Sequence, residues 1–206
     1  MAFPTMWSEV ALVSLYRKGD STTGEIEFAA ITEDISINEG DYPGESISTS
    51  AGGRLWKQGP QEDGEIELTI YPIEMASTGG VGMFQYWHGV SGASPAAYDT
   101  SEPLTSDTSW PAGAARIRDS WRVSILWTND PAVTSAGGAT AASTDGLRFY
   151  ATDCRIISHK SEWTPGDGLK TTVTFKYPAF NKAGTTRIGI WESGDNTAIA
   201  TLGAYS

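Results

Sequence analysis

Histidine, cysteine and paired carboxylates are the side chains with which this chain could catalyse a reaction or bind a metal. It contains two histidines, His88 and His159, and neither has a cysteine or carboxylate around it at metal-ligand spacing. We expect each to be a hydrogen-bonded residue of a helix or sheet. The single cysteine, Cys154, lies in a strand-like run, and we interpret it as a small buried residue.

Carboxylates are abundant, and a hydrolase could use two of them as acid and base. Here, however, nearly all of them alternate along exposed strand faces or lie in the turn signatures Asp63-Gly64, Asp145-Gly146 and Asp167-Gly168. No EF-hand-like ligand series accompanies the last of these turns. The glycines of 79–82 lack the lysine and hydroxyl residue of a phosphate-binding loop. We therefore predict no enzymatic activity and no cofactor, and a β-rich hydrolase is the third-ranked alternative.

The overall charge narrows the possible partners. The chain has 25 Asp and Glu against 14 Lys and Arg, which gives a formal net charge of -11. Such a surface repels phosphate, so direct binding to nucleic acid or to an anionic membrane is not expected. The N-terminus shows no secretory signal, no apolar run reaches membrane-spanning length, and a lone cysteine fits a reducing cytoplasm.

Apolar and polar residues alternate in about eight segments, which predicts strands. The first two should form a hairpin, as should the last long pair around the turn 164–168, and the alternation slips near Asp153, which indicates a bulge. One short helix is expected over 79–89, and surface loops over 90–119 and 132–146. These elements predict a single mainly β domain, 1–206, an antiparallel sandwich or partly closed barrel. The predicted strands are 9–17, 25–31, 34–37, 64–71, 120–128, 147–160, 169–177 and 186–191.

A long insert separates two of these strands. Residues 39–62 show no hydrophobic periodicity and are too many for a turn. Loops of this length inside a domain are usually functional or disordered. This one carries residue types favoured at protein interfaces, so we predict that it docks onto another subunit. The predicted contact residues are Tyr42, Arg54, Leu55, Trp56 and Lys57.

The eight tryptophans raise an alternative from another class, a carbohydrate-binding or receptor-binding β-sandwich module. Trp121 and Trp127 fall on one predicted core face and Trp87 in the predicted helix, so these are expected to be structural. Trp56 in the insert is the exception, and it could stack on a sugar ring.

The segments AAITEDISIN (29–38), AGGRLWKQ (51–58) and PQEDGEIELTIYP (60–72) resemble the N-terminal half of major tail tube proteins from long-tailed, non-contractile viruses. The likeness covers residues 10–75, and beyond them only the order of elements. It implies a tail tube fold whose subunits form rings, expected to be hexameric, with inner sheets joined into one barrel. The rings would stack into a tube that conducts the genome, with the long loop reaching into the neighbouring ring.

Further expectations follow from this resemblance. The protein would be part of the virion, assembled in the host cytoplasm, and its partners would be itself and the tape measure, tail terminator and baseplate proteins. The acidic balance would fit a salt-loving host. DNA would pass without specific binding, because a polar, acidic wall avoids the counterion release that makes DNA stick. The candidate lumen-facing residues are Glu25, Glu27, Glu65, Glu67, Thr69, Thr172 and Thr174.

Overall fold

The computed structural model describes residues 11–19, 25–27, 32–70, 119–166 and 168–206, and in this part of the chain every regular element is a strand. No described segment forms a helix that could cross a membrane. Because every described regular element is a strand and all their pairings are antiparallel, the prediction of a mainly β, antiparallel fold is confirmed. The predicted helix 79–89, with His88, and the loop 90–118 lie outside the described residues. The strands are β1 (Ala11–Arg17), β2 (Glu25–Glu27), β3 (Thr32–Asn38), β4 (Gly44–Ser48), β5 (Arg54–Gln58), β6 (Gly64–Ile70), β7 (Trp121–Thr128), β8 (Gly146–Thr164), β9 (Gly168–Tyr177) and β10 (Gly189–Gly194).

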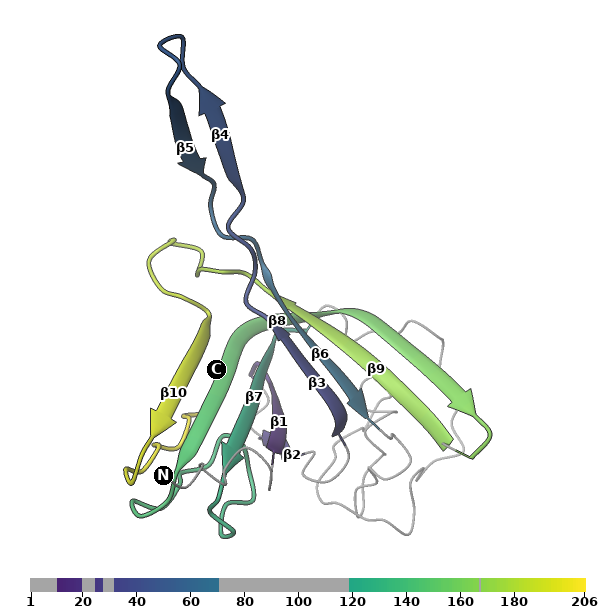
Figure 1. Cartoon of the computed structure of the whole chain (residues 1–206). Helices are drawn as coiled ribbons and strands as arrows, with labels where there is room; N and C mark the ends of the chain where they lie inside the picture. Colours follow the sequence, from purple (N-terminus) through teal and green to yellow (C-terminus); the bar gives the residue numbers. More distant parts are fainter. Residues whose placement is uncertain (1–10, 20–24, 28–31, 71–118, 167) are drawn as a thin grey trace, which may run out of the picture.

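All pairings between these strands are antiparallel. The main sheet has the order β2-β1-β7-β8-β9-β6-β3, with β10 paired to β8, while β4 and β5 form a separate hairpin. Figure 1 shows the main sheet curling like a half-barrel, with the β4–β5 hairpin standing away from one end. The predicted hairpins β1–β2 and β8–β9 are confirmed.

The strand β8 belongs to both halves of the curl. Its first half pairs with β7 and β10, and its second half pairs with β9. Between them lies Asp153 with a φ of 53°, a left-handed conformation that is uncommon outside glycine and is found at bulges. The predicted slip at this position is thus present, and a second register shift follows between Ile156 and Ser158.

The core lies between the two halves of the curl, because alternate side chains of five strands point inward. Trp121, Val123 and Ile125 of β7 are fully buried, as are Ile66 and Leu68 of β6. Cys154 is buried among them, and desolvation raises the pKa of its thiol, so the interpretation of a small core residue is confirmed. The remaining buried members of the cluster are Val13, Leu15, Phe149, Ala151, Ile156, Val173, Phe175, Tyr177 and Ile188.

The outer side of β1, β7 and the first half of β8 is also buried, and we call it the covered face. Arg148 is only 1% exposed; its guanidinium binds the Glu192 carboxylate and donates to the carbonyl oxygens of Gly138 and Ala200. Arg122 donates to the Gly203 carbonyl. Residues 200–205, which we call the strap, therefore lie across this face and are bound by Arg148 and Arg122.

The loop after β7 supplies the rest of this cover. Residues 132–146 were predicted to be a surface loop, and most of them are exposed or half-buried, but hydrogen bonds and one apolar contact fix the loop against the covered face. The buried Asp130 carboxylate accepts from the backbone N–H groups of Ala132 and Ala141, at 2.9 and 2.7 Å, and these bonds hold its pKa below the usual value. Ala136 packs with Leu12, Leu126 and Ile199. Hydrogen bonds to a buried carboxylate therefore order the loop together with this apolar contact.

Two further boundaries differ from the prediction. The last strand begins at Gly189 and ends at Gly194, three residues later at each end than expected. Phe180 and Arg187 form an isolated bridge ahead of it, which closes a tight loop before the strand begins. Residues 39–62 are not irregular throughout, because they contain β4 and β5.

Candidate assembly surfaces

The hairpin of β4 and β5, residues 44–58, is called the arm. Its register runs from Gly44 opposite Gln58 to Ser48 opposite Arg54, and Gly52 closes the tip with a φ of 80°. Every residue of both strands is exposed. An isolated two-stranded hairpin is at best marginally stable in water, so an arm of this kind gains most from a partner.

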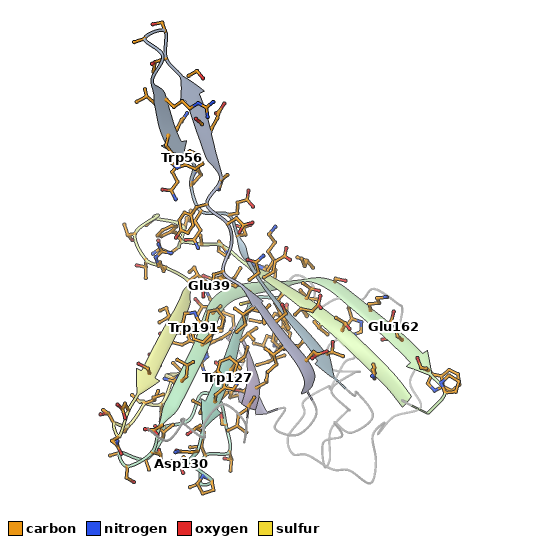
Figure 2. All side chains as sticks on the ribbon, in the orientation of Figure 1. Glu39, Trp56, Trp127, Asp130, Glu162 and Trp191 are labelled. Carbon is orange, nitrogen blue, oxygen red and sulfur yellow. The ribbon has the colours of Figure 1, made fainter. Side chains whose placement is uncertain are left out.

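The register puts large apolar side chains on both faces of the arm. Ile47 lies opposite Leu55 on one face, while Trp56 lies opposite Ser46 on the other. The Trp56 ring lies over Gly44, where any side chain would collide with it. Leu55 is 62% exposed and Trp56 69% exposed. Figure 2 shows Trp56 on the arm, well away from the labelled tryptophans of the body.

A hydrogen-bonded cluster fixes the base of the arm to the body. The Arg187 guanidinium donates to the Gln61 side-chain oxygen at 2.6 Å and to the Tyr42 hydroxyl at 3.1 Å. Tyr42 in turn donates to Gln61 at 2.8 Å, and the Trp191 indole donates to the Glu39 carboxylate at 2.9 Å. Tyr42 therefore lies at the base, where its hydroxyl is already engaged, while Arg54, Leu55, Trp56 and Lys57 lie on the arm itself.

The outer side of β3, β6, β9 and the second half of β8 is called the polar face. The pairing aligns its residues in transverse rows, one of which is Lys160, Thr172, Thr69 and Asp34. In the centre of this row the two threonine hydroxyls lie 3.3 Å apart. Two other rows run Ser158, Thr174, Glu67, Ser36 and Arg155, Lys176, Glu65, Asn38.

The sheet thus brings five of the seven candidate lumen residues onto one face. Glu25 is not among them: it lies on β2, where it accepts from Ser14 at 2.9 Å and from Ser135 at 3.0 Å and lies 3.7 Å from Arg122. These partners come from distant parts of the sequence, so local alternation could not reveal them. Glu27 is on β2 as well. The five candidate lumen residues that lie on the polar face are Glu65, Glu67, Thr69, Thr172 and Thr174.

The polar face also carries cations, which are not among the candidate lumen residues. Lys176 lies 3.9 Å from Glu65 and 4.0 Å from Asp63, and Lys160 forms an ion pair with Glu162. The predicted bulge was the available signal, because shifting the alternation after Asp153 places Arg155 and Lys160 beside Lys176 and Thr172. The face is therefore mixed in charge.

Edges complete the geometry of this half of the sheet. Among the described strands, β3 pairs only with β6, and the second half of β8 pairs only with β9. Each therefore has one side that no described strand occupies. Unpaired backbone N–H and C=O groups along such an edge form a template for another strand. Within the described residues, no three His, Cys, Asp or Glu side chains come together as a metal-binding group.

No protein-family model matches the sequence, and no curated protein matches it. Several solved structures are similar in fold. A chain of the anti-feeding prophage baseplate gives a TM-score of 0.49 at 10% identity, covering 93% of this chain and 97% of that one. A chain of the PVC sheath/tube terminator in the extended state gives 0.47 at 11% identity, covering 87% and 92%. A chain of the PVC sheath-tube complex gives 0.45 at 11% identity, covering 88% of each chain. At these scores the likeness assigns no function to this chain.

Proposed function

We propose that this protein is the structural subunit of a viral tail tube, which forms rings that stack into a channel for the genome. One observation carries the proposal: an arm with apolar side chains on both faces stands at one end of a sheet whose two edges are open among the described strands. The open edges suit joining within a ring, and the arm suits joining between rings.

The strand count of the polar half supports closure into a ring. Among the described residues it contains four strands, the second half of β8 followed by β9, β6 and β3, and each is antiparallel to its neighbour. Because this number is even, β3 runs antiparallel to β8. A second copy could therefore place its β8 against β3 and continue the same antiparallel alternation. A closed barrel removes the exposed edges altogether.

The arm supports stacking. It points away from the body at the end opposite the turn after β10, so copies arranged head to tail would bring the arm of one against the body of the next (Figure 1). Burying a side chain such as Leu55 contributes about 1.5–3 kcal/mol, so a contact that covers the arm would stabilise stacking. The resemblance of 29–38, 51–58 and 60–72 to tail tube proteins of non-contractile viruses agrees with both roles.

The sharpest test replaces the arm without disturbing its base. The Gly59 N–H donates to the Pro43 carbonyl at 2.6 Å, so an Asn-Gly turn could join these two residues in place of 44–58. Tyr42, Gln61 and Arg187 stay in place. We expect folded rings that no longer stack, observed by negative-stain electron microscopy with circular dichroism as the folding control. Tubes of normal length from this variant would contradict the role of the arm.

The exposed Trp56 also supports a second candidate, a carbohydrate-binding or receptor-binding module of a virion. The two functions separate on one substitution, Trp56→Ala. A sugar-binding module would bind polysaccharide arrays and lose that binding in the variant, whereas a tube subunit would show no such binding and would lose stacking. Trp163→Ala is the matched control for sugar binding alone, since Trp163 is 67% exposed but lies at the end of β8, outside the arm.

A further inference from the structure

The charges of the polar face are sorted across the sheet. Its acidic side chains are concentrated on one pair of strands and its basic side chains on the other. On β3 and β6 they are Asp34, Glu65 and Glu67; on β8 and β9 they are Arg155, Lys160, Lys170 and Lys176, with the single carboxylate of Glu162.

The two edge strands keep this asymmetry. On the polar face β3 carries the charge of Asp34, whereas the second half of β8 carries Arg155 and Lys160 against Glu162, a net of +1. Asp34 and Lys160 terminate the same transverse row, with two threonines between them. One row therefore begins with a cation at one edge and ends with an anion at the other.

Resting on the proposed function, we propose that ring closure uses an electrostatic seam, in which the β3 edge of one copy lies against the second half of β8 of a second copy. This joins the acidic strand pair of each subunit to the basic strand pair of the next. Closing a barrel offsets neighbouring rows, so the summed charge of the polar-face residues on each edge strand sets the attraction more than any single pair. Neighbouring strands lie about 4.8 Å apart, well within the screening length of about 10 Å at 0.1 M salt.

The seam also sets which edges meet. If two copies joined β3 to β3, two Asp34 carboxylates would approach each other, and a junction of β8 with β8 would bring together two strands of net positive charge. Like charges placed together disfavour both symmetric pairings. Only the head-to-tail junction brings opposite charges together, and head-to-tail contacts generate rings, whereas symmetric contacts end at dimers.

Two single substitutions test the seam by complementation. In Asp34→Lys the described polar-face charges of both edge strands become basic, and in Lys160→Glu both become acidic. Each variant alone should lose rings at concentrations where the unmodified chain forms them. An equimolar mixture should recover them, because alternating copies restore opposite charges at every seam. Rings would be counted by negative-stain microscopy and mass photometry at 0.1 M salt, with thermal unfolding of each variant as the folding control.

The outcomes separate the seam from the function. Recovery of rings only in the mixture supports the proposal, and a variant that had simply misfolded could not be rescued in this way. The seam would be overturned if the unmodified chain forms rings and either variant alone forms them equally well. It would also be overturned if the unmodified chain forms rings and the mixture of variants does not. In both cases the tube function would still stand. Unmodified chain that never forms rings would overturn both. Lys182→Glu, at an exposed position outside the polar face, is the matched charge control and should leave ring formation unchanged.

Discussion

The covered face and the polar face belong to one curled sheet but differ in how far the described chain provides partners for their polar groups. On the covered face, Arg148 and Arg122 have found partners within the chain, in Glu192 and in the carbonyl groups of the C-terminal strap. On the polar face, Asp34 and Glu67 are exposed and the edge strands have no described neighbour. The difference teaches that, among the described residues, only one half of this sheet is covered and paired by its own chain. Substitutions on the covered face should change folding, and substitutions on the polar face or in the arm should change assembly.

The largest effect is expected from Arg148→Ala on the covered face. It removes the ion pair with Glu192 and leaves the carbonyl groups of Gly138 and Ala200 without their donor. We expect the free energy of unfolding to fall by about 3 kcal/mol, because buried pairs are costly to break on one side. Urea unfolding followed by tryptophan fluorescence measures it. Arg54→Ala in the arm is the matched control, with a change under about 0.5 kcal/mol; equal losses in both would erase the distinction between the faces.

A smaller effect is expected from Tyr205→Phe in the strap. The Tyr205 hydroxyl lies 3.0 Å from the Ser120 hydroxyl, accepts from the Asp153 N–H at 2.8 Å and donates to the Asp153 carboxylate at 2.8 Å. Losing these bonds beside a strained bulge should cost about 1–2 kcal/mol. Thermal unfolding provides the value. An unchanged melting temperature would show that the Tyr205 hydroxyl contributes nothing to holding the strap.

Acid should loosen the covered face through Asp130. Its pKa is lowered by the N–H groups of Ala141 and Ala132, so its contribution is complete above the unfolded pKa of about 3.9 and is lost as pH falls through the lower folded value. Hydrogen exchange in residues 130–146 should therefore rise at the acidic end of this window. Asp130→Asn should raise exchange there at neutral pH and reduce its further rise in acid. Loosening of β6 and β9 ahead of this loop would contradict the prediction.

The smallest effect on folding is expected from Trp56→Ala. The exposed indole contributes little to the isolated chain, so the free energy of unfolding should stay within about 0.5 kcal/mol of the unmodified value. The same variant should fail to stack, which electron microscopy would show as rings without tubes. A large loss of stability would mean that Trp56 belongs to the fold and not to a contact surface.

Local alternation predicted most strands and the bulge at Asp153, because every second side chain of each core strand is an apolar residue that points into the core. It did not find β4 and β5, since strands exposed on both faces leave no such pattern. The order of the 132–146 loop and the position of Glu25 were also missed. Both depend on partners distant in sequence, such as Ile199 for the loop and Arg122 for the carboxylate, and no local pattern encodes such pairs.

The candidate site residues divide along the same line. Glu65, Glu67 and Thr69 were placed together correctly on one face because they alternate within one strand, and Thr172 and Thr174 join them through the pairing of β6 with β9. Arg155 and Lys160 on this face escaped notice because β8 changes register at the bulge, whereas Lys176 alternates with Thr172 and Thr174 within β9. The role of the face as a channel wall and of the arm as a docking element remain predictions.

Negative-stain electron microscopy of the purified, unmodified chain tests the central claim most directly. A tube subunit should form rings and hollow tubes at about 0.1 M salt, with longer tubes as protein concentration rises. Persistent monomers across a wide range of salt and protein concentration would contradict it.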